Sequence, residues 1–237
     1  MIRHNASEME AWLHGIAKQI PYATAAALNS TGFQIRMAER EEIRRAFDTP
    51  TPYTLNSVRV RKASVSNPSA MVFINDNARG KGTSPSEYLA RQVFGGGREH
   101  KVFERLLKTK EFLVPAPGTK LNRFGNLPKG VIKKVTSALD GGDTTKYFRR
   151  KGKNGKLSKA VYERRGRGRK KKIRPIMFAV RRPKYNRRFK FFNIGIRVAT
   201  KRFEANWNRE FNRIVVSGGR IGLIPKSRIV RFTEATP

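Results

Sequence analysis

The positive charge of this chain is concentrated in one short stretch, which limits the folds that the stretch can adopt. Residues 144–190 hold 21 Lys and Arg residues and one acidic residue, Glu163, so about a fifth of the chain carries +20 of its net charge of +35. Two runs in this stretch, 151–156 and 164–172, have the composition of flexible basic loops. A free monomer with this excess would repel other copies and bind polyanions, so anionic partners are expected.

Short apolar segments are interleaved with the basic runs. Residues 160–162 and 176–180 are predicted to form strands. The chain as a whole is 38% hydrophobic and has 15 Phe and 6 Tyr residues, which is enough apolar material for a core. The stretch is therefore predicted to be a hairpin-like sheet element that carries basic loops, not a disordered tail.

The N-terminal part is predicted to be helical. Ser7 to Glu10 have the form of a capping box that opens a short helix. Pro21 is expected to begin a second helix, which runs to about Phe47 and ends at the Pro-rich segment 48–52. The residues expected on or near its buried side are Ala23 to Ala27, Leu28, Phe33, Met37, Ile43 and Phe47.

Strands and shorter helices are predicted in the middle of the chain. The alternating segment 57–62 and the apolar segment 70–74 flank a turn at Asn67-Pro68, which predicts a hairpin. Ser84, Pro85 and Glu87 supply the N-cap, the first-turn proline and the third-position glutamate of a helix that ends at Phe94. Residues 112–118 are expected to be extended, and a further helix is expected after Pro128.

A long C-terminal helix is predicted over about 189–216. Its apolar stripe has a spacing of three to four residues and consists of Phe192, Ile196, Ala199, Phe203, Trp207, Phe211 and Ile214. A final extended segment is expected over 221–232. The predicted fold class is α+β, with the N- and C-terminal helices packed on a small, mostly antiparallel sheet that has long basic loops. Residues 1–143 and 144–237 are expected to be two parts of one continuous domain with an insertion.

Several functional classes are disfavoured by the sequence. The chain has no Cys, which excludes disulfides, thiolate zinc sites and Cys nucleophiles. No signal peptide and no apolar run long enough to span a bilayer is seen, so a soluble product that stays where it is made is expected.

Catalytic and metal-binding residues are not predicted. His4, His14 and His100 lack ligand spacing, and Asp140 and Asp143 flank two glycines in what is predicted to be a helix end and a turn. Glu39, with Glu41 and Glu42, stands at helical offsets from several Arg residues, which predicts surface ion pairs. No nucleophile, base and oxyanion donor are brought together, so we expect neither an enzyme nor a cofactor.

The basic stretch is the candidate functional site, and it supports more than one interpretation. The expected contact residues are Arg149, Arg150, Lys151, Lys153, Lys156, Arg164, Arg165, Arg167, Arg169, Lys170, Lys171 and Lys172. They are suited to phosphates, with Tyr147, Phe148, Tyr162 and Tyr185 nearby either as stacking groups or as core residues. They are equally suited to acidic protein surfaces in a symmetric assembly. A nuclear targeting signal at 164–172 is a third interpretation, although such clusters arise readily in basic proteins.

The order of these features resembles a known family. An Ala-rich N-terminal helix with Ala23 to Asn29 precedes basic alternating strands, a Lys- and Arg-rich central region and an amphipathic C-terminal helix with Phe203, Asn206, Glu210 and Phe211. This order resembles the minor tail protein Z family of tailed bacteriophages, the tail completion proteins. Residue-level similarity is confined to 21–75 and 185–215, and the stretch 84–143 departs from the shorter family members.

The resemblance implies a structural virion protein at the tail or the head–tail junction, made in the host cytoplasm. It implies a homo-oligomeric ring whose partners are other tail, neck or portal proteins and, through backbone contacts, the viral DNA, with no membrane partner. It supplies no catalytic residues. The alternative interpretation is a non-sequence-specific nucleic-acid-binding protein of ribosomal or chromatin-like type.

Overall fold

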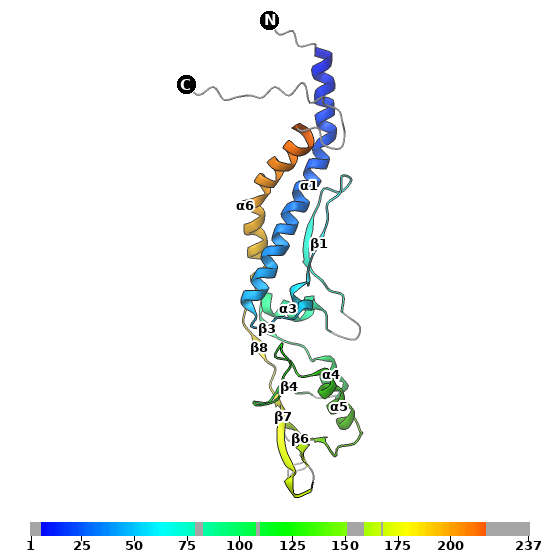
Figure 1. The fold of residues 1–237 in the computed structure, drawn as a ribbon, viewed down its shortest axis with the longest axis vertical. Coiled ribbons are helices and arrows are strands. Elements are labelled where there is room, and N and C mark those ends of the chain that lie inside the picture. Colours follow the sequence, from blue (N-terminus) through cyan, green and yellow to red (C-terminus); the bar gives the residue numbers. More distant parts are fainter. Residues whose placement is uncertain (1–5, 79–82, 108–109, 151–158, 167, 217–237) are drawn as a thin grey trace, which may run out of the picture. The chain divides into compact units, whose positions relative to one another are not determined.

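The computed structural model describes residues 6–78, 83–107, 110–150, 159–166 and 168–216 of the chain (Figure 1). They belong to two compact units. The helical unit is formed by Met1–Glu42, Val58–Ile74 and Lys190–Pro237, and the sheet unit by Ile43–Ser57 and Asn75–Phe189. The chain therefore passes between the units four times, and the change in composition after residue 143 falls within the sheet unit.

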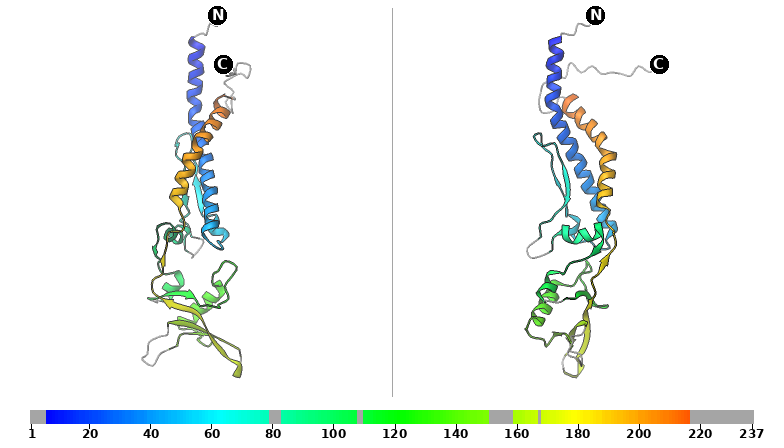
Figure 2. Two further views of the ribbon diagram at one scale, coloured as in Figure 1. Left: turned by 90° about the vertical axis from the view of Figure 1, so that its left-hand side faces the viewer. Right: turned by 180° about the vertical axis from the view of Figure 1, so that it is seen from behind.

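Two long helices lie side by side in the helical unit (Figures 1 and 2). Helix α1 spans Ala6–Ala46, and α6 spans Phe191–Phe211 and continues as a π-helical turn, Asn212–Val216. Strands β1 (Val58–Arg61) and β2 (Met71–Ile74) form the predicted antiparallel hairpin. The hairpin lies against α1, where the Asn29 side chain donates to the Ala63 carbonyl at 3.0 Å and accepts from the Ala63 N–H at 2.8 Å.

Helix α1 differs from the prediction at Pro21. The sequence predicted two helices with Pro21 at the start of the second, but the structure has one helix of 41 residues with Pro21 inside it. A proline in a helix removes one backbone donor and crowds the preceding turn. These effects are local, and the Ala-rich sequence that follows favours continuation of the helix.

Helix α6 buries the apolar stripe predicted for it only in part, because Ala199, Trp207, Phe211 and Ile214 are half-buried. Its buried residues are Ile194, Asn206 and Glu210, whereas Phe203 is exposed and Ile196 is 69% exposed. The Asn206 amide donates to Thr31 Oγ1 at 2.9 Å and to Gln34 Oε1 at 3.2 Å, so polar contacts join α6 to α1. The periodicity identified the helix correctly, and the stripe lies on the side of α6 that also carries Asn206 and Glu210.

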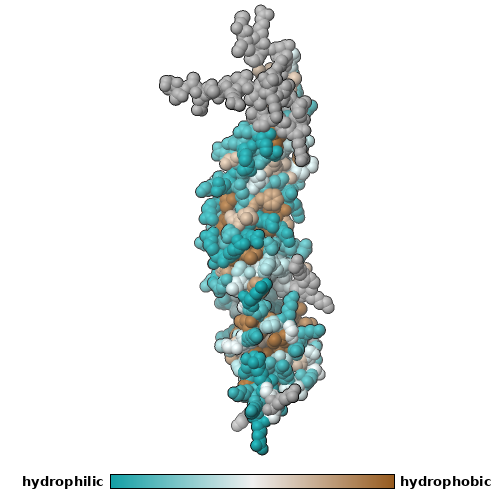
Figure 3. All heavy atoms as spheres, viewed as in Figure 1, coloured by the Kyte–Doolittle hydropathy of each residue, from teal (hydrophilic) through white to brown (hydrophobic). Residues whose placement is uncertain are grey.

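Exposed apolar side chains are also found on α1. Ala23, Ala25 and Ala27 are buried as expected, but Phe33 and Met37, which were predicted to lie on or near the buried side, are exposed. Figure 3 shows such apolar residues among the polar surface of the molecule.

The sheet unit is built on a four-stranded antiparallel sheet with the strand order β4-β7-β6-β5. These strands are β4 (Phe112–Pro115), β5 (Tyr147–Phe148), β6 (Ala160–Arg165) and β7 (Lys172–Val180). Helix α5 (Lys129–Leu139) covers the sheet and supplies Val135 and Ala138 to the core. The sheet's own core residues are Leu113, Tyr147, Val161, Ile176 and Met177.

The rest of the sheet unit consists of short elements. Helices α2 (Pro52–Leu55), α3 (Pro85–Phe94) and α4 (Val102–Leu106) precede β4, and β3 (Gly96–Gly97) pairs with β8 (Lys184–Tyr185). As predicted, the Ser84 side chain accepts a hydrogen bond from the Glu87 N–H at the start of α3.

The α+β fold class with terminal helices and small antiparallel sheets is confirmed. The terminal helices belong to the unit of the β1–β2 hairpin, and the basic hairpin belongs to the other unit. None of the described helices combines the length and the apolar character that a bilayer span requires.

Candidate anion-binding surface

The predicted contact residues that the structure describes are gathered on β5, β6, β7 and the turn between β6 and β7. Arg149 and Arg150 follow β5, Arg164 and Arg165 end β6, and Lys172 begins β7. Arg169 and Lys170 lie in a 3₁₀ turn, Gly168–Lys170, and Lys171 follows it. The predicted residues Lys151, Lys153, Lys156 and Arg167 lie outside the described residues.

The run 164–172, which the sequence predicted to be a flexible loop, belongs in part to strands, because Arg164 and Arg165 end β6 and Lys172 begins β7. Strand pairing continues to Arg165 opposite Lys172. Gly166 has a φ of 86°, and a Cβ atom at that position would lie 2.5 Å from the Lys170 carbonyl oxygen, so the turn requires glycine there. A flexible loop and a tight turn can have the same Gly, Lys and Arg composition, so composition does not distinguish them. The pairing of the flanking strands shows that a turn is present here.

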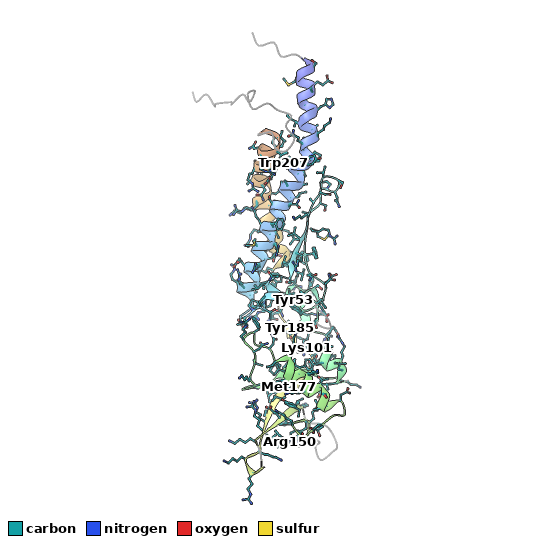
Figure 4. All side chains as sticks on the ribbon, turned by 45° about the vertical axis from the view of Figure 1, so that its right-hand side comes forward. Tyr53, Lys101, Arg150, Met177, Tyr185 and Trp207 are labelled. Atoms are coloured by element: carbon teal, nitrogen blue, oxygen red, sulfur yellow. The ribbon has the colours of Figure 1, made fainter. Side chains whose placement is uncertain are left out.

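The end of the β6–β7 hairpin carries four cations without ion pairs to other described residues. Arg169, Lys170, Lys171 and Lys172 are exposed, and none of them forms an ion pair with another described residue. Figure 4 shows long nitrogen-tipped side chains that project from this end of the sheet. The flanking strands hold these charges in place. When a polyanion binds them, the protein backbone therefore loses less conformational entropy than the backbone of a disordered basic tail would lose.

Two arginines stack on two aromatic rings on one face of the sheet. Phe148 and Tyr162 are cross-strand partners whose ring centroids lie 5.7 Å apart. Arg164 lies 3.8 Å from the Phe148 centroid, and Arg150 lies 4.8 Å from the Tyr162 centroid. The arginines are each two residues from a ring in the same strand or its extension, as the alternation of a strand requires.

This stacking orders the guanidinium groups. A guanidinium group that stacks by its face keeps the planar donor edge that suits phosphate or carboxylate. Arg164 is further fixed because its Nη1 donates to the carbonyls of Thr144 and Thr145, each at 2.8 Å.

A single carboxylate organises the other cations of the sheet. Glu163 is buried, and its Oε2 accepts from Arg165 Nε and from Arg174 Nε, both at 3.0 Å. Lys146 Nζ lies 4.0 Å from its Oε1, and the Tyr147 hydroxyl donates to the same atom at 3.4 Å. Three cations surround one anion, so Arg165 is partly neutralised where the sequence predicted a partner contact.

The aromatic residues of the basic stretch have different roles. Tyr147 is a core residue, and burial together with the Glu163 carboxylate raises the pKa of its hydroxyl. Phe148 and Tyr162 are half-buried and stack with arginines, and Tyr185 is half-buried in β8. The core interpretation is therefore confirmed for Tyr147.

In the part of the chain that the structure describes, no group of three or more His, Cys, Asp or Glu residues is arranged to hold a metal ion. His100 stacks on Phe112 at a centroid distance of 4.1 Å. Asp143 accepts hydrogen bonds from the N–H and the hydroxyl of Thr145, as the predicted turn requires, and these bonds lower the pKa of the Asp143 carboxyl.

Sequence reasoning missed two buried carboxylates. Glu104 forms a bidentate ion pair with Arg98, with both oxygen–nitrogen distances at 2.6 Å. Glu39 was predicted to form surface ion pairs, and this is wrong, because it is fully buried and neither of its oxygens has a hydrogen-bond partner among the described residues. No local pattern distinguishes these glutamates from exposed ones.

Comparisons of the chain with protein-family models, with curated proteins and with solved structures find no match.

Proposed function

We propose that this protein is a structural virion protein of a tailed bacteriophage. It acts as a tail completion or head–tail junction component, assembles as a homo-oligomeric ring, and contacts DNA or acidic neighbouring subunits. The observation that carries this proposal is the placement of the charge on a folded hairpin. Arg169, Lys170, Lys171 and Lys172 are exposed at the end of β6 and β7, without ion pairs to other described residues.

The helical unit supports the assembly part of the proposal. Large apolar side chains are exposed on α1 and α6, among them Met37 and Ile196, while Asn206 and Glu210 are buried between the helices. Exposed apolar side chains in this number are typical of surfaces that another chain covers.

The phage assignment is supported by the resemblance described above. An Ala-rich α1, the β1–β2 hairpin and α6 occur in the order that the resemblance requires. These elements form one unit, the helical unit, although they are far apart in the sequence. A non-enzymatic role is proposed on the same basis, with no cofactor and no metal.

Virion composition tests the proposed function. We expect mass spectrometry of purified virions of the encoding phage to find this chain as a stoichiometric component, in a fixed ratio to the portal and tail proteins. The matched control is the lysate of the same infection after removal of virions. A chain that occurs in the lysate but not in gradient-purified virions would overturn the proposal.

The alternative, a non-sequence-specific nucleic-acid-binding protein, is favoured by the stacked arginines Arg150 and Arg164. Such a protein reads the phosphate backbone, and its affinity depends strongly on salt because binding releases counterions.

A charge-matched pair of variants tests where a polyanion binds. The triple substitution Arg169→Gln, Lys170→Gln and Lys171→Gln should lower the slope of log K against log salt for duplex DNA by about 2–3, since each phosphate contact contributes about 0.9. The control, Lys18→Gln, Arg59→Gln and Arg61→Gln, removes the same charge from exposed positions of the helical unit.

The control variant should leave the slope unchanged. Equal losses in the two variants would show that net charge alone attracts DNA, which contradicts a specific role of the hairpin. Unchanged DNA binding together with lost binding to neighbouring virion proteins would identify acidic protein as the partner.

A further inference from the structure

An apolar stripe is exposed on the N-terminal part of α1. Met9, Leu13 and Ile20 are exposed, Leu13 by 54%, and Ile16 is half-buried. At 100° per residue these four positions lie within a narrow arc of one helix face. Helix α1 extends past the end of α6 in this region (Figures 1 and 2).

The stripe continues the face by which α1 packs on α6. About two and three turns beyond Ile20 on the same face, Ala27 and Thr31 are buried, and Thr31 accepts a hydrogen bond from Asn206 of α6. The face of α1 that contacts α6 therefore continues beyond the end of α6, where it carries larger apolar side chains. These side chains are suited to a protein partner.

The same unit contains an apolar groove. It has a volume of about 390 Å³ and lies between α1, β2 and α6, where Leu28, Gly32, Val72 and Phe203 are among its lining residues. A side chain at position 32 would meet Val60 Cγ1 at 3.1 Å, so glycine allows α1 and the hairpin to approach closely beside the groove. A groove of this kind accepts the apolar face of an amphipathic helix.

The stripe cannot fill the groove of its own chain. Leu28 is the groove residue of α1 nearest to Leu13 in sequence, and 15 residues of helix separate their positions by about 22 Å along the axis. A helix is too stiff to fold back over that distance, so a stripe that occupies a groove must come from another copy.

The N-terminal segment that carries the stripe is less positively charged than the rest of the chain. It is therefore better suited to contact another copy. Residues 1–20 contain two basic and two acidic residues and have no net charge, whereas the whole chain has +35. Glu10 is exposed beside the stripe, and Lys201 and Arg202 are exposed on α6 next to the groove residue Thr200. A neutral segment can contact a groove that is flanked by Lys201 and Arg202 without electrostatic repulsion. Contact between two basic surfaces of two copies would be repulsive.

We propose that the N-terminal part of α1 in one copy docks in the groove between α1, β2 and α6 of the next copy. The contact is heterologous, because two different surfaces meet, and repetition of such a contact closes a ring when its rotation permits. This interface adds a mode of assembly to the proposed function. Its placement in a virion ring rests on the proposed function.

Cysteine cross-linking tests this interface directly in the full chain, because the natural sequence has no Cys. Leu13→Cys and Thr200→Cys chains of distinguishable mass are mixed and oxidised. We expect a disulfide-linked pair that contains one chain of each kind. The matched control is Ala11→Cys, which is exposed and lies about 200° from Leu13 around the helix.

The control pair of Ala11→Cys with Thr200→Cys should cross-link at least tenfold less. Equal yields for the two pairs, or links only between two Leu13→Cys chains, would overturn the proposal. The proposal would also fail if the thiol of Leu13→Cys were protected from alkylation in a monomer. The last outcome would mean that another segment of the same chain covers the stripe.

Sedimentation provides a second readout that does not depend on thiol geometry. Leu13→Glu should shift the assembled species to monomer, whereas Ala11→Glu, with the same charge change, should not. If both variants assemble like the natural chain while virions contain the protein, the interface is wrong and the proposed function stands. If the cross-link forms but virions lack the chain, the interface stands and the virion role fails.

Discussion

Replacing Glu104 with Ala is expected to destabilise the sheet unit by about 3–5 kcal/mol. Glu104 is 0% exposed, and its two oxygens accept from the two terminal nitrogens of Arg98. They also accept from the backbone N–H groups of Lys101 at 2.6 Å and Leu113 at 2.7 Å. The side chain therefore joins the segment before α4 to the start of β4, and its removal leaves a buried guanidinium without a counterion.

The same contacts give the sheet unit a dependence on acid. Burial alone would raise the pKa of Glu104, but the hydrogen bonds from Arg98, Lys101 and Leu113 outweigh it and hold the pKa below the usual value of 4.5. A lowered pKa in the folded state means that the stabilisation is present above pH 4.5 and is lost as the pH falls through the folded pKa. Glu104→Gln should remove this part of the acid transition.

Hydrogen exchange of the β4 and β7 amides is a suitable measurement, because both Trp residues, Trp12 and Trp207, lie in the helical unit and do not report on the sheet. The control is Glu99→Ala, which removes an exposed partner of Arg182 and is expected to cost less than about 1 kcal/mol. Comparable losses for the two variants would contradict the special role of the buried pair.

Local sequence patterns predicted most elements of this fold. The Ser84-Pro85-Ser86-Glu87 cap, the alternating strand at 58–61 and the helical spacing after Pro128 all occur where their signals placed them. Each of these signals is contained in one element, because caps and periodicity depend on residues within about a turn of one another. Helix α4 was not predicted, since five residues are too few for a periodic signal.

Properties that depend on distant segments were not predictable in the same way. The apolar stripe of α6 includes Ile196 and Phe203, which are exposed. Asn206 and Glu210 lie on the same side of the helix, and these two are buried and contact α1. Spacing shows which side chains share a face and does not show what covers that face. The basic residues were correctly placed on a hairpin, but the engagement of Arg165 and Arg174 by Glu163 depends on cross-strand register, which the sequence did not specify.

Glu39 is expected to make the helical unit less stable as the pH rises. Burial, and secondarily the charge of Glu42, raise the pKa of Glu39 from 4.5 to about 8, although Arg197 acts in the opposite direction. Between these two values the unfolded chain releases the proton and the folded chain retains it, so the free energy of unfolding falls as the pH rises from 4.5 to 8. Above pH 8 the loss is complete and no longer grows.

The expected loss is large because the carboxyl group is buried and neither of its oxygens accepts a hydrogen bond from another described residue. Each unit of pKa difference corresponds to about 1.4 kcal/mol, so the full effect is on the order of 4–5 kcal/mol. Glu39→Gln has nearly the same shape and cannot ionise. It should match the natural protein near pH 4.5 and exceed its stability by about 4 kcal/mol near pH 8.

Urea unfolding followed by Trp fluorescence measures this difference, because both Trp residues belong to the helical unit. Glu204→Gln is the matched control, since Glu204 is exposed on α6 in the same unit and should leave the pH profile unchanged. A natural protein whose helical unit is equally stable at pH 5 and pH 8 would show that Glu39 ionises freely. Its carboxylate would then have a partner in solution, most simply a guanidinium group such as that of Arg197, and the buried environment seen here would not persist.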